Sequence, residues 1–303
     1  MTDGHRLPTE TGRAFADFKD KAPNWCPGCG DFGVLGAMQR AAAELDLDPD
    51  RTVLVTGIGC SGNVTAFFRT YGFHGVHGRA LPAATGIKLA DPALTVLVAG
   101  GDGDGFGIGL GHLVHAARRN LDVTYIVMDN QTYGLTKGQV SPTSAQGFVT
   151  KTTPDGSPDA PVDALALSLI AGATYLGVGF SGDIKRLTEL IKGAVRHEGF
   201  SLVQTMSPCV TFNKTNTFSW YKDRLVDLEA EGHDPTDRAA ALHQVTRTDG
   251  RIPHGLIFRT ERPPLHRAVG VLGGREAAPA TEDLEFTLRS RAADLKALRD
   301  RFA

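Results

Sequence analysis

Residues 100–136 read GGDGDGFGIGLGHLVHAARRNLDVTYIVMDNQTYGLT, and this stretch decides the fold. It begins with a turn in which glycine alternates with aspartate, and a second polar turn, DNQT, follows at 129–132. An apolar run rich in β-branched residues precedes each turn, at 94–99 and 123–128, and a helix-like segment, 108–119, lies between the runs. The pattern predicts a strand, a helix and a strand, which would bring both turns to one edge of a parallel sheet.

The polar groups of the two turns suit a hard divalent cation such as Mg²⁺. Asp102 offers a carboxylate, Asn130 a side-chain carbonyl, and the backbone at Thr132 another oxygen. Such a cation usually completes its coordination with phosphate oxygens and water. The glycines let backbone approach phosphates closely, and the next helix would point its positive end toward them. The stretch therefore predicts a site for a diphosphate-bearing cofactor, against the alternative of an ordinary glycine-rich turn with a solvated acid.

Length and composition are those of a globular protein. The 303 residues, 41% of them hydrophobic, are enough for one large α/β domain or two. A formal net charge of −2 gives no electrostatic reason to expect binding to nucleic acid or to an anionic membrane. The first 21 residues lack the apolar core of a signal peptide, and glycines interrupt the longest uncharged run, 164–182. These features predict a cytoplasmic protein without a membrane span.

Strand and helix patterns alternate along the chain and predict a doubly wound, mostly parallel sheet. The expected strands are 52–56, 94–99, 123–128, 175–178 and 202–205, and the expected helices are 33–45, 86–90, 108–119, 162–171 and 184–197. Four strands lead into candidate functional turns, GIGC at 57–60, GGDGD at 100–104, DNQT at 129–132 and MSPC at 206–209. Because parallel sheets bind ligands at the carboxyl ends of their strands, these turns are expected to share one edge. The charge-rich stretch 224–251 is predicted to be a solvated excursion.

Four cysteines lie in turns beside glycine or proline. They are Cys26 and Cys29 in WCPGCGD, Cys60 in TGIGCSG and Cys209 in SPCVTFN. Two structural disulfides are not expected in a cytoplasmic protein. Four thiolates suit either a structural zinc ion or an iron–sulfur cluster. Since two of the cysteines follow strands that end beside the predicted cofactor, the redox cluster is favoured over zinc.

These motifs, taken in order, resemble those of a known family. WCPGCGD, TGIGCSG, TYGFHGVHGRA, GDGD, DNQTYGLTKGQVSPTS and SPCVTFN are similar to motifs in the β subunits of 2-oxoacid:ferredoxin oxidoreductases, most closely the 2-oxoglutarate type. The resemblance divides the chain into an N-terminal extension, 1–23, a cofactor-binding domain, 24–220, and a C-terminal extension, 221–303, which is expected to pack on the domain or on a partner subunit. Leucines at 284, 288, 295 and 298 predict an amphipathic helix in that extension.

The resemblance implies thiamine diphosphate, Mg²⁺ and a [4Fe–4S] cluster as cofactors. Cys26, Cys29, Cys60 and Cys209 match the cluster ligands of the family, and Asp102, Asn130 and the carbonyl of Thr132 match its magnesium site. The positions that match its thiamine diphosphate site are Ile58, Gly59, Cys60, Ser61, His77, Gly78, Gly101, Asp102, Gly103, Asp104, Asn130, Gly134, Leu135 and Thr136. His77 and Leu135 are candidates for contact with the substrate, and Leu135 together with Lys137 favours 2-oxoglutarate over pyruvate.

The implied activity is the oxidative decarboxylation of a 2-oxoacid to an acyl-CoA, for 2-oxoglutarate succinyl-CoA, with electrons passing through the cluster to ferredoxin. In this family the glutamate that activates the cofactor lies on a separate α subunit. The chain is therefore expected to be catalytic only with that subunit, in an α₂β₂ heterotetramer. Three alternatives stay open: an enzyme for pyruvate or a broad range of 2-oxoacids, a thiamine diphosphate decarboxylase with zinc on its cysteines, and a non-catalytic electron carrier.

Overall fold

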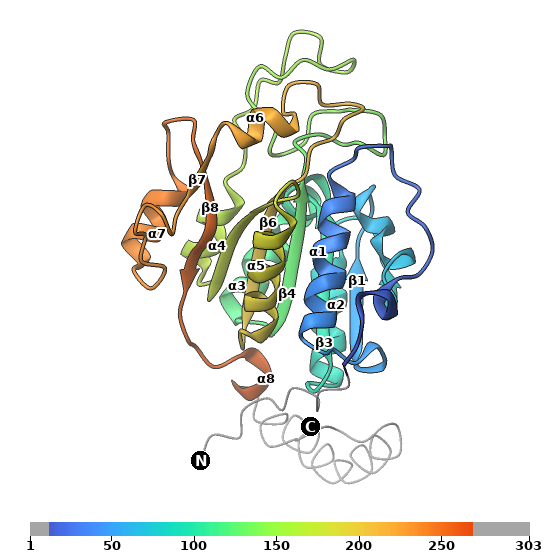
Figure 1. The fold of residues 1–303 in the computed structure, drawn as a ribbon. Coiled ribbons are helices and arrows are strands. Elements are labelled where there is room, and N and C mark those ends of the chain that lie inside the picture. Colours follow the sequence, from blue (N-terminus) through green and yellow to red (C-terminus); the bar gives the residue numbers. More distant parts are fainter. Residues whose placement is uncertain (1–11, 269–303) are drawn as a thin grey trace, which may run out of the picture.

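The computed structural model describes residues 12–268, which form an eight-stranded sheet with helices on both faces (Figure 1). The strands are β1 (Thr52–Thr56), β2 (Tyr71–His74), β3 (Thr95–Gly101), β4 (Val123–Asp129), β5 (Tyr175–Phe180), β6 (Phe200–Met206), β7 (Leu225–Asp227) and β8 (Ile252–Arg259). They are arranged in the order β2-β1-β3-β4-β6-β5-β8-β7, and only the pair β5 and β8 is antiparallel. The prediction of a mostly parallel, doubly wound sheet is confirmed.

Two layers of helices cover the sheet (Figure 1). Helices α1 (Asp31–Glu44) and α5 (Ile184–Arg196) pack on one face, and α2 (Ala80–Ala90), α3 (Leu110–Arg119) and α4 (Ala164–Ala171) pack on the other. The shorter helices are α6 (Phe218–Lys222), α7 (Arg238–Val245) and α8 (Leu265–Ala268). The 3₁₀ turns are η1 (Phe15–Phe18), η2 (Pro49–Arg51) and η3 (Ser61–Ala66), and the π-helical turn η4 spans Gly103–Ile108.

The central strand β4 shows why the buried strands could be predicted from the sequence. All seven of its residues are buried, because helices cover both faces of the sheet. Val123, Tyr125 and Val127 point into the core beneath α2, α3 and α4. Ile126 and Met128 point into the opposite core, beneath α1 and α5. A strand buried on both faces requires a continuous apolar run, and such a run was visible in the sequence.

Helix α5 illustrates how the surrounding layer forms. The side chain of Asp183 caps its first turn by accepting a backbone N–H. Leu187, Leu190, Ile191 and Ala194 recur at helical spacing and are buried against α1 and the sheet. The apolar face of the helix therefore fixes its position, and the predicted helix at 184–197 is one residue longer than the helix observed.

Three of the differences from the sequence-based expectation concern α2, η4 and β2. Helix α2 begins at Ala80 rather than at 86, and Pro82 is tolerated there because N–H groups in a first helical turn have no partner within the helix. The helix expected from Ile108 is preceded by the π-helical turn η4, so helical backbone begins directly after Asp102. Strand β2 was not predicted, because it is only four residues long, lies exposed at the sheet edge and lacks the continuous apolar run of a buried strand.

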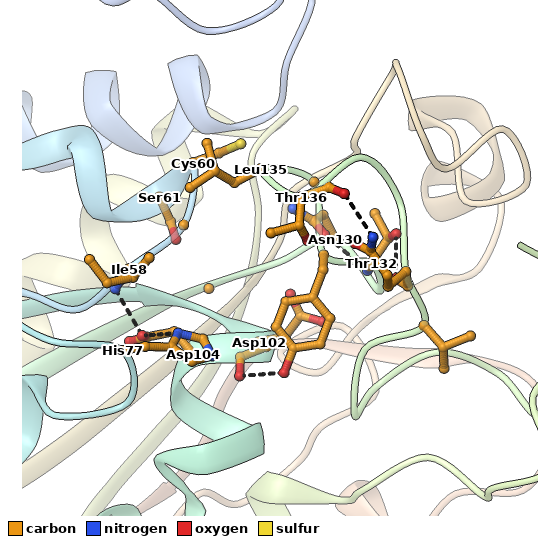
Figure 2. Close-up of a pocket in the computed structure, with 17 residues that line it drawn as sticks. Ile58, Cys60, Ser61, His77, Asp102, Asp104, Asn130, Thr132, Leu135 and Thr136 are labelled. Carbon is orange, nitrogen blue, oxygen red and sulfur yellow. Dashed lines mark hydrogen bonds and ion pairs between the residues drawn. The ribbon is translucent and has the colours of Figure 1, made fainter. Parts of the chain in front are cut away.

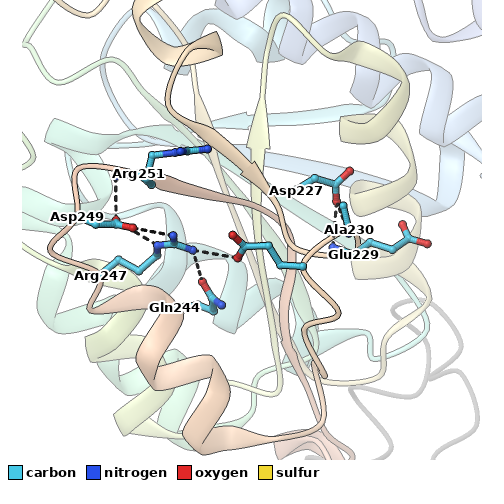
Figure 3. A network of polar contacts seen from close by, with 8 residues as sticks. Asp227, Glu229, Ala230, Gln244, Arg247, Asp249 and Arg251 are labelled. Carbon is cyan, nitrogen blue, oxygen red and sulfur yellow. Dashed lines mark hydrogen bonds and ion pairs between the residues drawn. The ribbon is translucent and has the colours of Figure 1, made fainter.

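The stretch 224–251 is not a solvated excursion, and this prediction is wrong. It forms β7 and α7, and Val226, Leu228 and Ala241 are buried in the core. Its charges lie on the outer side, where Arg247 binds Glu231 at 3.2 Å and Asp249 at 2.8 Å (Figure 3). The few buried apolar residues of this stretch are outnumbered by surface charges, so its composition alone predicted a solvated segment.

The ends of the described chain are tied to the domain. Phe18, in the predicted N-terminal extension, is fully buried and packs against Phe68 with ring centroids 5.9 Å apart. In the predicted C-terminal extension, β8 pairs with β5 and so enters the sheet. The amphipathic pattern at 284–298 lies outside the described residues. Within residues 12–268, no helix is long and apolar enough to cross a membrane.

Candidate active site

The four candidate turns lie side by side at one edge of the sheet. Neighbouring parallel strands carry them in register, with Thr56 opposite Ala99 and Asp129 opposite Met206. A cavity of about 410 Å³ opens at this edge (Figure 2). It is lined by Ile58, Gly59, Cys60, Ser61, His77, Gly101, Asp102, Gly103, Asp104, Asn130, Thr132, Tyr133, Gly134, Leu135, Thr136, Gln139 and Val140. Of the positions expected to contact thiamine diphosphate, Gly78 alone is missing from this lining.

The buried carboxylate of Asp104 holds one wall of the cavity together through hydrogen bonds. Its carboxylate is 2% exposed, and Oδ1 accepts the N–H of Ile58 at 2.9 Å and the N–H of Gly78 at 2.7 Å. His77 Nδ1 lies 2.9 Å from the same oxygen, as Figure 2 shows. A Cβ at Gly57 would lie 2.1 Å from Asp104 Oδ2, so only glycine fits there. Asp104 therefore joins the turn after β1 to the turn before α2, and the N–H of Gly78 is bonded to it rather than facing the cavity.

Asp102 lies at the floor of the cavity and is 1% exposed. Its Oδ2 accepts hydrogen bonds from Ser141 Oγ at 2.5 Å and from Thr143 Oγ1 at 2.7 Å. Burial raises the pKa of this carboxyl, whereas the two hydroxyl groups oppose the rise by stabilising the charged form. Sequence reasoning assigned no role to these hydroxyl groups, although the quoted motif DNQTYGLTKGQVSPTS contains them.

A second buried carboxyl, that of Asp129, lies directly behind the first. Thr143 Oγ1 is 2.8 Å from Asp129 Oδ1, and Gln204 Nε2 donates to Asp129 Oδ2 at 2.6 Å. Burial, followed by the charge of Asp102, raises the pKa of Asp129 to about 7. Asp129 does not line the cavity, so it acts as a support for the floor rather than as part of it.

The turn after β4 brings Asn130 and Thr132 to the opposite wall (Figure 2). Asn130 Oδ1 accepts the N–H of Thr132 at 3.0 Å, and Thr132 Oγ1 donates to the carbonyl of Gln139 at 2.9 Å. Asn213 Nδ2 donates to the backbone carbonyl of Asn130 at 3.0 Å and ties the turn to the segment after β6. One carboxylate, one amide oxygen and the backbone oxygens of this turn form a donor set that fits a hard cation such as Mg²⁺.

The four cysteines come together beside the cavity. A Cβ at Gly134 would lie 3.5 Å from Cys60 Sγ and 3.7 Å from Cys209 Sγ, so these thiols flank one residue. The turn that carries Cys26 and Cys29 is fixed to the same place, because the N–H of Gly30 donates to the carbonyl of Pro208 at 3.0 Å. All four thiols are free.

The environment of these thiols suits a metal cluster. Trp25 Nε1 donates to the carbonyl of Cys60 at 2.7 Å and so ties the segment before Cys26 to the turn that carries Cys60. Burial, then the charge of Asp31 and the neighbouring thiols, raises the pKa of Cys60 to about 11. Burial also raises the pKa of Cys29. Metal binding would replace the thiol protons and remove the mutual repulsion of thiolates.

Neither candidate site has the form of a compact single-ion site made of charged side chains. Within residues 12–268, no three His, Cys, Asp or Glu side chains converge closely enough to hold one metal ion. The predicted magnesium site needs only one carboxylate beside neutral oxygens. A [4Fe–4S] cluster is larger than an ion, so its four cysteines stand apart around it. Cys60 belongs to both sites, since its thiol lies beside that of Cys209 and the residue lines the cavity.

Comparison with known proteins finds the same architecture elsewhere. Residues 35–205 match the family model of the thiamine pyrophosphate enzyme C-terminal TPP-binding domain, and residues 209–273 match that of the C-terminal part of the pyruvate ferredoxin oxidoreductase β chain. The chain is 42% identical to 2-oxoacid:ferredoxin oxidoreductase 2, subunit beta, of Aeropyrum pernix over 289 residues, 90% of this chain and 93% of that one.

Two further relatives carry more specific names. The 2-oxoglutarate oxidoreductase subunit KorB of Mycobacterium tuberculosis is 46% identical over 217 residues, which cover 70% of this chain and 58% of the relative. A solved structure of 2-oxoglutarate:ferredoxin oxidoreductase from Magnetococcus marinus, with 2-oxoglutarate, coenzyme A and succinyl-CoA bound, superposes with a TM-score of 0.84. That comparison has 42% identity and covers 95% of this chain and 99% of the other.

Proposed function

The chain belongs to the family of 2-oxoacid:ferredoxin oxidoreductase β subunits, and we propose that with an α subunit it oxidatively decarboxylates 2-oxoglutarate to succinyl-CoA. The KorB relatives are named as subunits of a 2-oxoglutarate oxidoreductase or a 2-oxoglutarate synthase, and the solved structure is of a 2-oxoglutarate:ferredoxin oxidoreductase. The observation that carries the proposal is the cavity itself, which has carboxylate, amide and backbone oxygens suited to a cation on one side and the grouped cysteine thiols on the other. An enzyme for pyruvate is the second candidate.

Residues 35–205 form a thiamine diphosphate-binding domain. When bound, this cofactor supplies a carbanion for attack on the 2-oxo carbon and a ring that takes up the electron pair left by carbon dioxide. Asp102, Asn130 and the carbonyl of Thr132 would hold Mg²⁺ for the diphosphate. Asp104 holds the facing wall rigid through its bonds to the backbone of Ile58 and Gly78. His77 and Leu135, which both line the cavity, are the proposed substrate contacts of this chain.

The four cysteines are the proposed ligands of a [4Fe–4S] cluster, which would accept electrons singly and pass them to ferredoxin. Their grouping beside the cavity supports this assignment over a distant structural zinc site. Cysteines that bind a metal cluster rather than form disulfides also suit a reducing compartment, in keeping with the proposed cytoplasmic location. Cys60 would hold the cluster with its thiol while its backbone forms part of the cavity wall.

A partner chain is needed to close the cavity. Two exposed apolar side chains line it, Ile58 by 38% and Leu135 by 52%, and two more lie next to His77 and Gly78, Val76 exposed by 71% and Ile108 by 54%. Such a group of exposed apolar residues indicates a surface that another protein covers. We assign this rim to the α subunit, which would also bring the activating glutamate, in an α₂β₂ assembly.

The test is to co-express this chain with its α subunit under anaerobic conditions. Addition of 2-oxoglutarate should bleach the visible absorption of the cluster, and coenzyme A with ferredoxin should then permit turnover. Pyruvate serves as the comparison substrate, because it is a 2-oxoacid that lacks the distal carboxylate of 2-oxoglutarate. Equal rates with pyruvate would contradict the substrate assignment, and one zinc without iron would contradict the cluster.

A further inference from the structure

The motif Ser141-Pro142-Thr143-Ser144 has no part in the proposed reaction, yet it lies directly behind the cation ligand Asp102. Ser141 is 4% exposed, Thr143 7% and Ser144 2%, although all three carry hydroxyl groups that water could otherwise bind. Burial of a hydroxyl group is costly unless the group forms hydrogen bonds inside the protein. The partners of these hydroxyl groups therefore show what the motif does.

The motif is fixed from both sides. Ser144 Oγ donates to the carbonyl of Gln131 at 2.7 Å and accepts the N–H of Ser141 at 2.8 Å. The carbonyl of Pro142 accepts the N–H of Val162 at 2.8 Å. The loop is thus anchored to the turn after β4 and to the segment before α4, so the hydroxyl groups of Ser141 and Thr143 have fixed positions.

Both of these hydroxyl groups bind the same oxygen of the Asp102 carboxylate, Oδ2. Two short hydrogen bonds occupy the lone pairs of that oxygen and fix the rotation of the carboxylate plane. The other oxygen, Oδ1, is then the one that can bind a cation. A ligand held in this way does not have to be reoriented when the metal arrives, and this preorganisation strengthens binding.

The two hydroxyl groups are not equivalent. Thr143 Oγ1 lies 2.7 Å from Asp102 Oδ2 and 2.8 Å from Asp129 Oδ1, but a hydroxyl group carries one proton and donates to one acceptor at a time. Ser141 has no second carboxylate within hydrogen-bonding distance, and its other neighbours, the hydroxyl oxygens of Thr143 and Ser144, lie at 3.4 and 3.3 Å, so Asp102 Oδ2 at 2.5 Å is its nearest and only charged acceptor. Ser141 should therefore contribute mainly to metal binding, whereas Thr143 should contribute to metal binding and to the stability of the buried carboxyl pair.

We infer that Ser141 and Thr143 are positioning residues that set the Mg²⁺ affinity of this site by orienting Asp102. The inference rests on the proposed function, because it assumes that Asp102 is a magnesium ligand. It also separates two explanations of the motif. If the hydroxyl groups only compensate a buried charge, their removal should lower stability and leave metal affinity unchanged.

The experiment uses the complete complex with the α subunit, freed of metal and cofactor by chelation. Mg²⁺ is titrated calorimetrically at a fixed concentration of thiamine diphosphate, and the melting temperature of each metal-free variant is recorded. Ser141→Ala should weaken Mg²⁺ binding by about 10- to 100-fold, the usual cost of losing a group that orients a metal ligand, with little change in melting temperature. Thr143→Val should weaken Mg²⁺ binding and lower the melting temperature.

Two control variants accompany these. Ser141→Thr keeps the hydroxyl group and should bind Mg²⁺ nearly as tightly as the unmodified complex. Thr152→Val removes an exposed hydroxyl group from the same connection between β4 and α4 and should change nothing. If Thr143→Val fails to fold, Ser141→Ala and Ser141→Thr still decide the question.

The outcomes distinguish the inference from its premise. Mg²⁺ binding by Ser141→Ala within twofold of the unmodified complex would overturn the inference and leave the proposed function intact. Failure of the unmodified complex to bind Mg²⁺ in the presence of thiamine diphosphate would overturn the magnesium site, and the inference with it. A loss of affinity in Ser141→Ala that Ser141→Thr restores would support both.

Discussion

The parallel strands have their carboxyl ends on one side of the sheet, the carboxyl edge, and their amino ends on the other, the amino edge. Both edges carry buried polar residues, but they differ in how these residues are paired. At the carboxyl edge, oxygens and thiols line a cavity and keep bonding capacity free for a ligand. At the amino edge, the buried polar groups bond to one another. Lys88 Nζ lies 2.8 Å from Asp122 Oδ2 and donates to the carbonyl of Leu94 at 2.8 Å.

Asn120 completes the amino edge. It ends α3 with φ 52°, a left-handed conformation that asparagine tolerates better than most residues. Its Oδ1 accepts the N–H of Phe200 at 2.9 Å and the hydroxyl of Thr174 at 2.7 Å, and its Nδ2 donates to the carbonyl of Arg262 at 2.6 Å. Polar groups that are fully used within the chain stabilise the fold, whereas those left available serve binding, often at a cost in stability. Substitutions at the two edges should therefore separate stability from function.

The largest effect is expected from Cys209→Ser at the carboxyl edge. Loss of one thiolate ligand should remove the cluster, so that iron content, visible absorption and ferredoxin reduction are almost completely lost. Iron analysis and anaerobic spectroscopy of the complex measure the result. Thr211→Ser, in the same loop, is the matched control and should keep its iron. Full iron content in Cys209→Ser would show that the fourth ligand is misassigned.

Asp102→Asn should nearly abolish Mg²⁺-dependent binding of thiamine diphosphate. The amide lacks the charge that attracts the cation, and we expect affinity to fall by about 100-fold or more. Stability should not fall, because the substitution removes a buried charge. Calorimetric titration and thermal unfolding of the same sample test both halves of this statement, with the exposed Asp50→Asn as control. A large drop in the melting temperature of Asp102→Asn would contradict the view that polar groups of the carboxyl edge serve binding rather than stability.

The amino edge should respond in the opposite way. Lys88→Met leaves the carboxylate of Asp122 buried without its cation, which should cost about 3 kcal/mol in the free energy of unfolding. Cofactor affinity in the folded complex should stay unchanged. Adding Asp122→Asn removes the buried negative charge that Lys88 had balanced and should recover part of the loss, as measured by denaturant unfolding. Weaker cofactor binding at full stability in Lys88→Met would contradict the assignment of this edge to stability.

The smallest effect is expected on the outer surface at the end of the sheet. Arg247 bonds to Glu231, Gln244 and Asp249 in the network of Figure 3, but both acidic partners are largely exposed. Exposed ion pairs contribute little, so Arg247→Gln should lower the free energy of unfolding by less than about 1 kcal/mol. The difference should shrink further at high salt. A loss as large as that of Lys88→Met would mean that the network is a structural anchor.

The strands that could be predicted from the sequence are the buried ones. Strands β1, β3, β4, β5 and β6 were found because both faces of each are covered, which requires apolar runs. Strand β2 is exposed, and β8 contains Pro253 and Gly255 within a charged neighbourhood, so neither carries that signal. The turns of the site were predicted together because the carboxyl ends of parallel strands share an edge.

The supporting contacts of the site could not be predicted in the same way. The hydrogen bond between Asp104 and Ile58 joins positions 46 residues apart, and the one between Thr143 and Asp102 joins positions 41 residues apart. No local pattern encodes such pairs, because they exist only once the sheet has set the distance between the turns. For the same reason Gly78 was expected in the cavity lining, although its N–H is directed to Asp104.

Gly134 lines the cavity, and its Cα lies beside the thiols of Cys60 and Cys209. The proposed cofactor site and the proposed cluster would thus meet at a residue that has no side chain. If the four cysteines hold the proposed cluster, this short distance would govern how fast electrons leave the cavity, and the methyl group of Gly134→Ala would lie between the two at ordinary contact distance from both sulfur atoms.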